Sequence, residues 1–336
     1  MKNLKNNTSF LFTFIHWPVI IRILCIIFII NISFGVLIHF IEPAEFPAIF
    51  DGVWWAIVTT ATLGYGDYVP VTVTGRSLAI LLIFFGTGFV TTYFVALAAS
   101  AVATQNAYLE GKVEYKGEGH IIIVGWNERV KESLMQIREL VKKPVGVVLI
   151  DQTLEQNPLH DQNVHYIKGN PIYDQVLLKA NVKNASLVVI TSDQSKDEVQ
   201  ADMNAVLTLL TVKGLNPDVH TIVEILTSAQ VTNARRAGAD EIIQTNMLSS
   251  YCLINSMVSY GMSNTVLNML DQLKGSKLKY LDTEESYIGM TFEKLSNQLL
   301  QNKILLIGIK RREDTMVNPP LFTLIQADDS LLVIKD

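Results

Sequence analysis

Two long apolar segments constrain the fold of this chain more than any other feature. Residues 17–41 carry Arg22 as their only formal charge, and residues 77–103 carry none. At about 1.5 Å per helical residue, each segment can cross a bilayer core about 30 Å thick. Arg22 lies near the start of the first segment, where a long side chain reaches the headgroups. The sequence therefore predicts two membrane-spanning helices surrounded by lipid.

The overall composition indicates a membrane part joined to a soluble part. With 49% hydrophobic residues, 18% charged residues and a mean hydropathy of +0.29, the chain is too apolar for an ordinary soluble protein and too charged for one that lies wholly in the membrane. The net charge of −5 and the lack of a basic patch exclude a nucleic-acid-binding role. Cys25 and Cys252 are too far apart in the sequence to suggest a disulfide framework or a metal site.

The region between the two spans has the pattern of a pore. Residues 50–61 are too short to cross a bilayer and suit a half-length helix that other parts of the protein shield from lipid. After this helix, Gly64 and Gly66 can adopt positive φ values, so that the carbonyl groups of residues 62–66 can point to one side. Rings of such carbonyls can replace the water around an ion.

These residues carry a specific resemblance. The string Thr62-Leu63-Gly64-Tyr65-Gly66-Asp67 resembles the T-x-G-Y-G-D signature of potassium channels, with leucine where valine or isoleucine is usual. The resemblance implies that K⁺ is the permeant ion, coordinated by residues 62–66, and that four copies form a homotetramer around one pore. We expect Tyr65 to face away from the ion, toward Trp54 and Trp55.

Basic residues predict the orientation. Lys and Arg lie before the first span and after the second, whereas residues 41–51 carry three acidic residues and no basic one; the basic residues are Lys2, Lys5, Arg22, Lys112 and Lys116. By the positive-inside rule, both termini are expected on the cytoplasmic side of the cell membrane, with Arg76 as a single counter-example. The first span is too long for a cleaved signal peptide.

From about residue 120 the pattern predicts a doubly wound parallel sheet, a Rossmann-like α/β fold. Short β-rich runs alternate with helical stretches, at residues 121–124, 145–150, 164–167, 187–190, 221–226 and 241–243. Gly125 ends the first strand, and Asp151 ends the second, where an acidic residue would hold a ribose. Asn127 and Val130 replace the other two glycines of G-x-G-x-x-G. Two readings stay open: a nucleotide or dinucleotide site at Gly125, Asn127, Glu128 and Asp151, or a Rossmann sheet without a ligand.

A second resemblance covers most of the remaining chain. Residues 120–128 and 235–240 resemble two segments of the RCK domain, also called TrkA-N. With the filter, they identify the chain as similar to the MthK-like and YugO-like potassium channels, which have two spans and an RCK domain. The resemblance implies a pore domain (1–103), a linker (104–119), an N-lobe (120–246), crossover helices (247–277) and a small α+β C-lobe, TrkA-C (278–336). It also implies RCK dimers in a gating ring, and leaves open whether extra RCK copies complete the ring.

Gating requires a part that bends and a ligand that favours one state. Gly86 and Gly88 lack side chains in the second span and are candidate hinge residues, although such glycines also allow close helix packing. The resemblance places the calcium ligands of calcium-gated relatives at Thr191, Glu224 and Leu226, so Glu224 is only a weak divalent-cation candidate. The acidic residues Asp193, Asp197 and Glu198 could form another site or a solvated surface. A nucleotide or dinucleotide is the favoured RCK ligand.

Two other classes of protein fit the sequence less well. A membrane-anchored nicotinamide enzyme would leave the filter motif unexplained, and no Cys-His, Ser-His-Asp or Tyr-x-x-x-Lys constellation is placed for chemistry. A regulatory subunit of a potassium transporter would be soluble and would lack a pore. We therefore expect a ligand-gated potassium channel and not an enzyme.

Overall fold

The structure is a computed structural model that describes residues 17–140, 145–193, 195–271, 273, 275–312 and 314–335. The basic residues Lys2 and Lys5, on which the predicted orientation partly rests, lie outside the described residues. The chain forms two compact units, residues 1–108 and 109–336. The first contains the predicted pore, and the second contains the predicted RCK domain.

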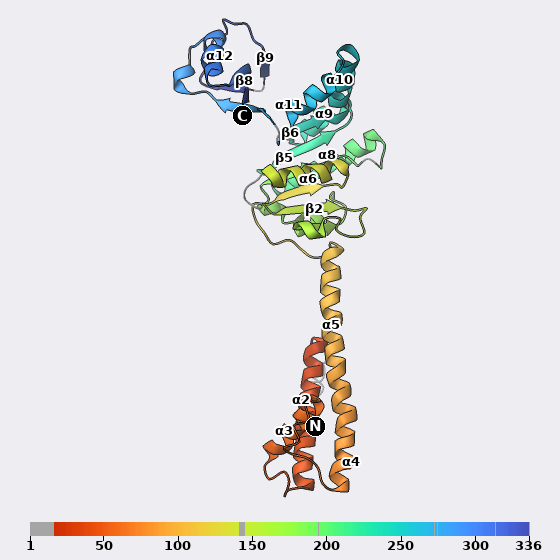
Figure 1. Ribbon diagram of the computed structural model, residues 1–336. Helices are drawn as coiled ribbons and strands as arrows, with labels where there is room; N and C mark the ends of the chain where they lie inside the picture. Colours follow the sequence, from red (N-terminus) through yellow and green to blue (C-terminus); the bar gives the residue numbers. More distant parts are fainter. Residues whose placement is uncertain are drawn as a thin grey trace, which may run out of the picture. The chain divides into compact units, whose positions relative to one another are not determined.

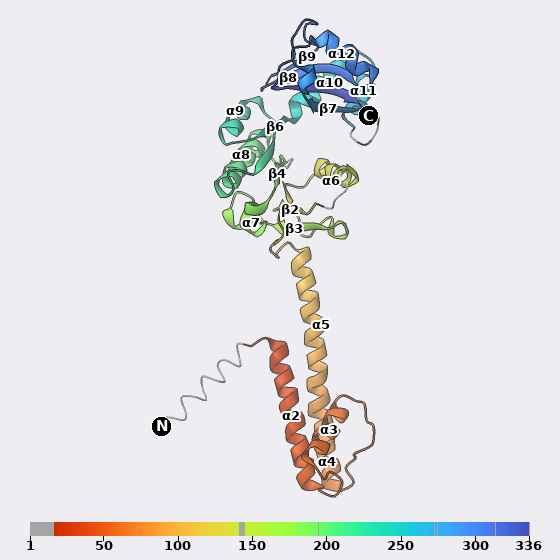
Figure 2. The same cartoon turned by 90° about the vertical axis from the view of Figure 1, so that its left-hand side faces the viewer.

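The first unit is helical. Its elements are α2 (Val19–Ile41), the short α3 (Ile49–Thr60), and a continuous helix made of α4 (Val73–Leu82), the π-helical turn η1 (Ile83–Thr87) and α5 (Gly88–Leu109). Figures 1 and 2 show α2 and the continuous helix side by side. Val19–Ile41 and Val73–Leu109 are long and apolar enough to cross a membrane. Only 17% and 11% of their apolar stretches are buried, so they are not core helices of a soluble fold.

Close packing and a carboxylate fix the ends of these helices. A Cβ on Gly52 would lie 2.2 Å from the Gly35 carbonyl oxygen, so α2 and α3 approach at the level of their backbones. The Glu42 carboxylate accepts hydrogen bonds from the backbone N–H of Val71 (3.0 Å) and of Thr72 (2.9 Å). The Thr72 side chain in turn caps the helix by accepting from Gly75 N (3.0 Å). The second helix therefore begins at Val73, before the predicted start at residue 77.

The same helix also extends beyond its predicted end. It continues to Leu109, into the segment predicted as the linker, because residues 104–109 contain neither glycine nor proline. Gly111 follows with a φ of 69°, a conformation that ends a helix.

The second unit begins with a parallel six-stranded sheet in the order β3-β2-β1-β4-β5-β6. Its strands are β1 (Ile121–Val124), β2 (Val147–Asp151), β3 (Val164–Lys168), β4 (Leu187–Ile190), β5 (His220–Ile225) and β6 (Glu241–Gln244). One face carries α6 (Glu128–Leu140), and the other carries α7 (Asp174–Lys179), α8 (Glu198–Leu215) and α9 (Ser228–Arg236) (Figure 2). Short 3₁₀ turns, η2 (His160–Gln162) and η3 (Val182–Asn184), lie in the connections. The predicted doubly wound sheet is confirmed.

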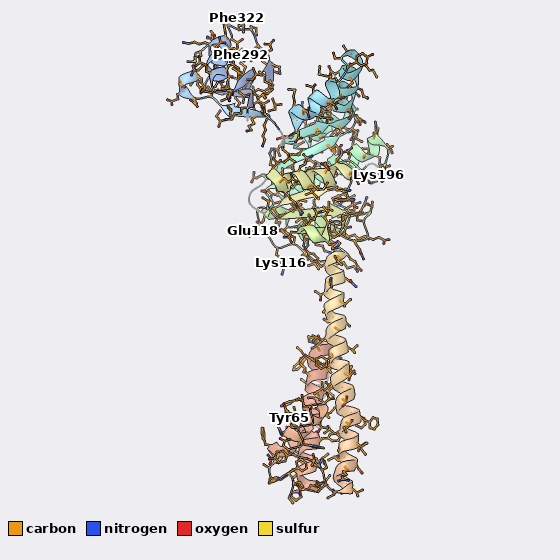
Figure 3. All side chains as sticks on the ribbon, viewed as in Figure 1. Tyr65, Lys116, Glu118, Lys196, Phe292 and Phe322 are labelled. Carbon is orange, nitrogen blue, oxygen red and sulfur yellow. The ribbon has the colours of Figure 1, made fainter. Side chains whose placement is uncertain are left out.

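Two helices and a small α+β lobe complete the chain. The helices are α10 (Thr245–Val258) and α11 (Met262–Leu270). The lobe has an antiparallel sheet in the order β7-β10-β8-β9, formed by β7 (Lys277–Asp282), β8 (Leu305–Arg311), β9 (Asp314–Val317) and β10 (Asp329–Lys335), with η4 (Glu285–Tyr287) and α12 (Phe292–Gln301). Phe292, at the start of α12 (Figure 3), is buried in its core. The buried Asp329 carboxylate pairs with the Arg311 guanidinium at 2.7 Å.

Candidate functional site

The backbone after α3 has an alternating conformation. Positive φ occurs at every second residue, with 59° at Thr62, 57° at Gly64 and 76° at Gly66. Alternation between positive and negative φ turns successive carbonyl groups toward the same side, as a ring of carbonyl ligands requires. Thr62 is β-branched, and a β-branched residue rarely adopts positive φ, so this position holds strained backbone. The strain lies at the first residue of the predicted filter.

Hydrogen bonds connect this segment to the helix before it. Leu63 N donates to the Val58 carbonyl at 3.0 Å, and Thr62 N donates to the Thr59 carbonyl at 3.1 Å. The C-terminal end of α3 therefore determines where the alternating segment begins.

An aromatic pair braces the other end of the segment. The Tyr65 ring (Figure 3) stacks on the Trp54 indole with centroids 6.1 Å apart and an interplanar angle of 13°. Trp54 Nε1 donates to Asp67 Oδ2 at 2.8 Å. Trp55, the other predicted partner of Tyr65, is buried and packs against Phe46 at 5.6 Å. Of the two tryptophans, Trp54 therefore contacts the predicted filter segment and Trp55 forms part of the core.

The two candidate hinge glycines have different surroundings. Gly86 is buried inside the π-helical turn η1, and a Cβ there would lie 2.1 Å from Thr60 Cγ2. Gly88 begins α5, and a Cβ there would meet nothing within 4 Å. Within this chain, Gly86 is thus in contact with α3 and Gly88 is not.

A cleft opens at the carboxyl ends of β1, β2 and β4, where the strand order reverses. Gly125 has a φ of 91°, and a Cβ there would lie 2.6 Å from Thr191 Oγ1, so the tight turn after β1 requires glycine. Asn127 Oδ1 accepts from Val130 N at 3.0 Å and caps the start of α6. Ligands of open α/β sheets bind at such a switch point.

Asp151 lines this cleft, and its carboxylate is already hydrogen-bonded. Oδ2 accepts from Trp126 N (2.9 Å), and Oδ1 accepts from Thr153 N (2.6 Å), Thr153 Oγ1 (2.6 Å) and Leu154 N (3.0 Å). The carboxylate therefore shapes the cleft as well as lining it. Glu128 differs, because its side chain is 86% exposed and pairs with Lys131 at 3.2 Å.

A lysine stands at the rim of the cleft. Lys196 (Figure 3) lines it and pairs with Asp193 at 3.2 Å. Burial works to raise the pKa of Asp193, but hydrogen bonds from Ser195 and the ion pair with Lys196 outweigh it and hold the pKa below its ordinary value. The rim therefore carries a paired positive and negative charge.

Comparisons with known proteins agree with this architecture. Residues 20–103 match the ion channel family model, and residues 121–245 match the TrkA-N domain. The chain is 42% identical to a protein named as a potassium channel, YugO of Bacillus subtilis, over 98% of this chain and 100% of that one. The chain belongs to the family of potassium channels that carry a TrkA-N domain.

A further relative and a solved structure add to this comparison. The calcium-gated potassium channel TvoK of Thermoplasma volcanium is 28% identical over 84% of this chain and 83% of its own length. A solved structure of the GsuK channel bound to NAD has a TM-score of 0.51 and 17% identity, and shares the fold. It covers 94% of this chain, which spans 57% of the GsuK chain.

Glu224 is the position that the family resemblance marks as a weak cation candidate, and its carboxylate is occupied by the protein itself. The side chain is 7% exposed and lies 2.8 Å from the Arg129 guanidinium. Oε2 also accepts from Ser192 N at 2.8 Å, and Oε1 accepts from Thr245 Oγ1 at 2.6 Å. A guanidinium and two neutral donors thus surround this carboxylate.

The other acidic candidates also have partners within the chain. Asp197 caps α8 by accepting from Gln200 N at 3.0 Å, and Glu198 accepts from Asn246 Nδ2 at 2.9 Å. Among the residues that the structure describes, no group of three or more His, Cys, Asp or Glu side chains could hold a metal ion.

Several contacts at these sites carry no signal in the sequence. Arg129 and Glu224 form a hydrogen bond although 95 sequence positions separate them, and 29 positions separate Thr60 from Asn31. For the positive φ of Thr62, the only signal in the sequence is the alternation that Gly64 and Gly66 continue. Contacts at such distances depend on the folded packing, which residue spacing does not reveal.

Proposed function

We propose that four copies of this chain form a K⁺-selective membrane pore and that its cytoplasmic domain gates the pore by binding a nucleotide or dinucleotide. The observation that carries the proposal is the alternating backbone of residues 62–66 directly after a pore helix. The family relationship supports it, because the relatives are named as potassium channels. A membrane-anchored enzyme or a soluble regulatory subunit has no such support.

The exposure of the filter supports a multimer. Leu63 is 59% exposed and Tyr65 is 65% exposed in the single chain. One copy supplies one set of carbonyls, whereas an ion must be surrounded on all sides. A homotetramer around a common axis completes the ring.

The cytoplasmic domain offers apolar surfaces for assembly. Large apolar side chains are exposed on α8 and on the crossover helices α10 and α11; they include Met203, Leu207, Leu210, Leu248, Leu253, Ile254, Met257, Val258, Leu267 and Leu270. Contiguous exposed apolar surface marks an interaction site. We assign these faces to contacts between RCK domains, in dimers and in a ring. We place both chain termini in the cytoplasm.

The cleft supports a nucleotide ligand more than it supports calcium. Gly125, Asp151 and Lys196 offer a tight turn, a carboxylate and a cation at a switch point, and the related GsuK fold has been solved with NAD. Asn127 caps α6 with its own side chain, so phosphate binding there would use the remaining N–H groups of the helix start. Calcium would have to displace the Arg129 guanidinium from Glu224.

A flux assay tests the proposal. Purified full-length chain in liposomes should pass K⁺ far better than Na⁺, and NAD or ADP should change the K⁺ flux, because a ligand that prefers one state of the ring shifts the gate. Equal permeability to Na⁺ and K⁺ would overturn the pore assignment. Selective flux that neither nucleotide changes would overturn the ligand assignment alone.

The segment after α5 is anchored to the N-lobe. The Tyr115 ring lies 4.6 Å from the His120 ring and 5.2 Å from the His165 ring. Tyr115 N donates to the Lys179 carbonyl at 2.8 Å, and Val113 O is 2.8 Å from His165 Nε2. Burial lowers the pKa of both histidines, so they are neutral near pH 7. We propose that this anchor transmits movements of the N-lobe to α5.

Tyr115→Ala should therefore reduce the effect of the ligand on open probability while K⁺/Na⁺ selectivity remains. Loss of a half-buried aromatic ring removes about 3 kcal/mol of packing free energy, which is enough to detach the segment from the N-lobe part of the time. Single-channel recordings with and without nucleotide measure both properties. Lys116→Ala, an exposed position in the same segment (Figure 3), serves as the matched control. Full ligand sensitivity in Tyr115→Ala would contradict the anchoring role.

A further inference from the structure

Three helices of the membrane unit meet at Thr60, the last residue of α3. Thr60 is 2% exposed, and Asn31 of α2 is 5% exposed. Asn31 Nδ2 lies 2.9 Å from the Ile27 carbonyl oxygen, and Thr60 Oγ1 lies 3.0 Å from Asn31 Oδ1. A polar side chain is rare inside a membrane segment and usually has a specific partner.

The direction of these hydrogen bonds follows from their chemistry. The Ile27 carbonyl can only accept, so the amide NH₂ of Asn31 faces it and Oδ1 faces Thr60. The Thr60 hydroxyl has one proton and two acceptors in reach, Asn31 Oδ1 at 3.0 Å and the Ile57 carbonyl oxygen of its own helix at 3.1 Å, and only the bond to Asn31 connects two helices. The bond between Thr60 and Asn31 connects the C-terminal end of α3 to α2.

The methyl group of Thr60 faces Gly86 of η1. A Cβ built on Gly86 would lie 2.1 Å from Thr60 Cγ2 and 3.1 Å from Thr60 Cβ. Thr60 Cγ2 is attached directly to a stiff β-branched carbon, so it cannot swing away as the end of a long side chain could. Gly86 thus leaves the space that the Thr60 methyl group occupies, inside the π-helical turn η1.

We propose that Thr60 is a positioning residue for the filter. Its hydroxyl holds α2 and its methyl group fits against Gly86, so that the end of α3, and with it the strained Thr62, keeps one position. On this account Gly86 is required for the space it leaves and not for the flexibility of its backbone. The inference rests on the proposed pore function of residues 62–66.

Gly86→Ala paired with changes at Thr60 tests the steric part. In the full-length channel in planar bilayers, we expect Gly86→Ala to lower the K⁺ current about tenfold, because overpacking displaces the end of α3. Adding Thr60→Ser removes the methyl group and keeps the hydroxyl, so Gly86→Ala with Thr60→Ser should regain most of the current of Thr60→Ser alone. Adding Thr60→Val keeps a methyl group at that place and should give no recovery.

The hydroxyl part is tested by removing the hydrogen bond. Thr60→Val and Asn31→Leu should each lower the K⁺/Na⁺ permeability ratio, because each breaks the bond between α3 and α2, and Thr60→Val also leaves the buried Asn31 Oδ1 unsatisfied. The double variant Thr60→Val with Asn31→Leu should be less impaired than the sum of the two single losses, because neither polar group then remains. A purely additive loss would overturn the positioning role of the hydrogen bond.

The outcomes separate this inference from the proposed function. If the unmodified chain passes no K⁺, the pore assignment fails. If it conducts selectively but Thr60→Ser gives no recovery in the Gly86→Ala background, the space requirement fails and backbone flexibility at Gly86 is favoured. The yield of assembled channel on size-exclusion chromatography is measured for every variant, and for Gly86→Ala it should recover with Thr60→Ser and not with Thr60→Val.

Discussion

Gly66→Ala is expected to abolish selective K⁺ conduction. Gly66 has a φ of 76°, and an alanine in this left-handed region costs about 1–2 kcal/mol in each copy. No neighbouring atom lies within 4 Å of the Cβ position in the single chain, so the effect arises from backbone conformation and not from a clash within the chain. The carbonyl groups on either side should turn away from the ion path in all copies together. Gly64→Ala, at a φ of 57°, should behave in the same way.

Liposome flux with K⁺ and with Na⁺ measures this result. Gly214→Ala is the matched control, because it makes the same chemical change in α8, where a Cβ also meets nothing within 4 Å and φ is not positive. The control should conduct like the unmodified chain. Selective K⁺ flux through Gly66→Ala at the unmodified rate would show that residues 62–66 do not form the filter.

Adenine nucleotides are expected to stabilise the cytoplasmic domain, and Asp151→Asn should weaken this effect. A ligand at about 100 times its Kd adds about 2.7 kcal/mol to the free energy of unfolding. Loss of a charged acceptor for the ribose hydroxyls should weaken binding about tenfold or more. Because Asp151 also holds Trp126, Thr153 and Leu154, the variant will be less stable without ligand.

Thermal unfolding of the full-length channel, with and without NAD or ADP, therefore compares the ligand-induced shift within each variant. Asp328→Asn makes the same change at an exposed position of the C-lobe and should keep the full shift. An equal shift in Asp151→Asn would refute the proposed ribose contact. Ca²⁺ is expected to give little shift, because Arg129 already pairs with Glu224. A large Ca²⁺ shift would direct attention to Asp193, Asp197 and Glu198.

The arrangement of the elements could be predicted because its signals are local. Apolar length determines a membrane span, and alternation of β-rich and helical runs determines a parallel α/β sheet. The predicted strands at residues 121–124 and 187–190 coincide with β1 and β4. The boundaries of the second span were less predictable, because Glu42 and Thr72 set its start through contacts that are distant in the sequence.

By itself, the sequence determined the two spans, the filter motif, the Rossmann-like sheet and the glycine turn after β1, since each depends on residue type within one short segment. Only the tertiary structure decided how side chains from separate segments meet: that Trp54 and not Trp55 braces Tyr65, that Arg129 occupies the Glu224 carboxylate, and that Thr60 connects Asn31 with Gly86. The last two contacts join positions far apart in the chain, which packing alone brings within reach of one another. Trp54 and Trp55 are neighbours in the chain, and only the folded structure shows which of them faces Tyr65.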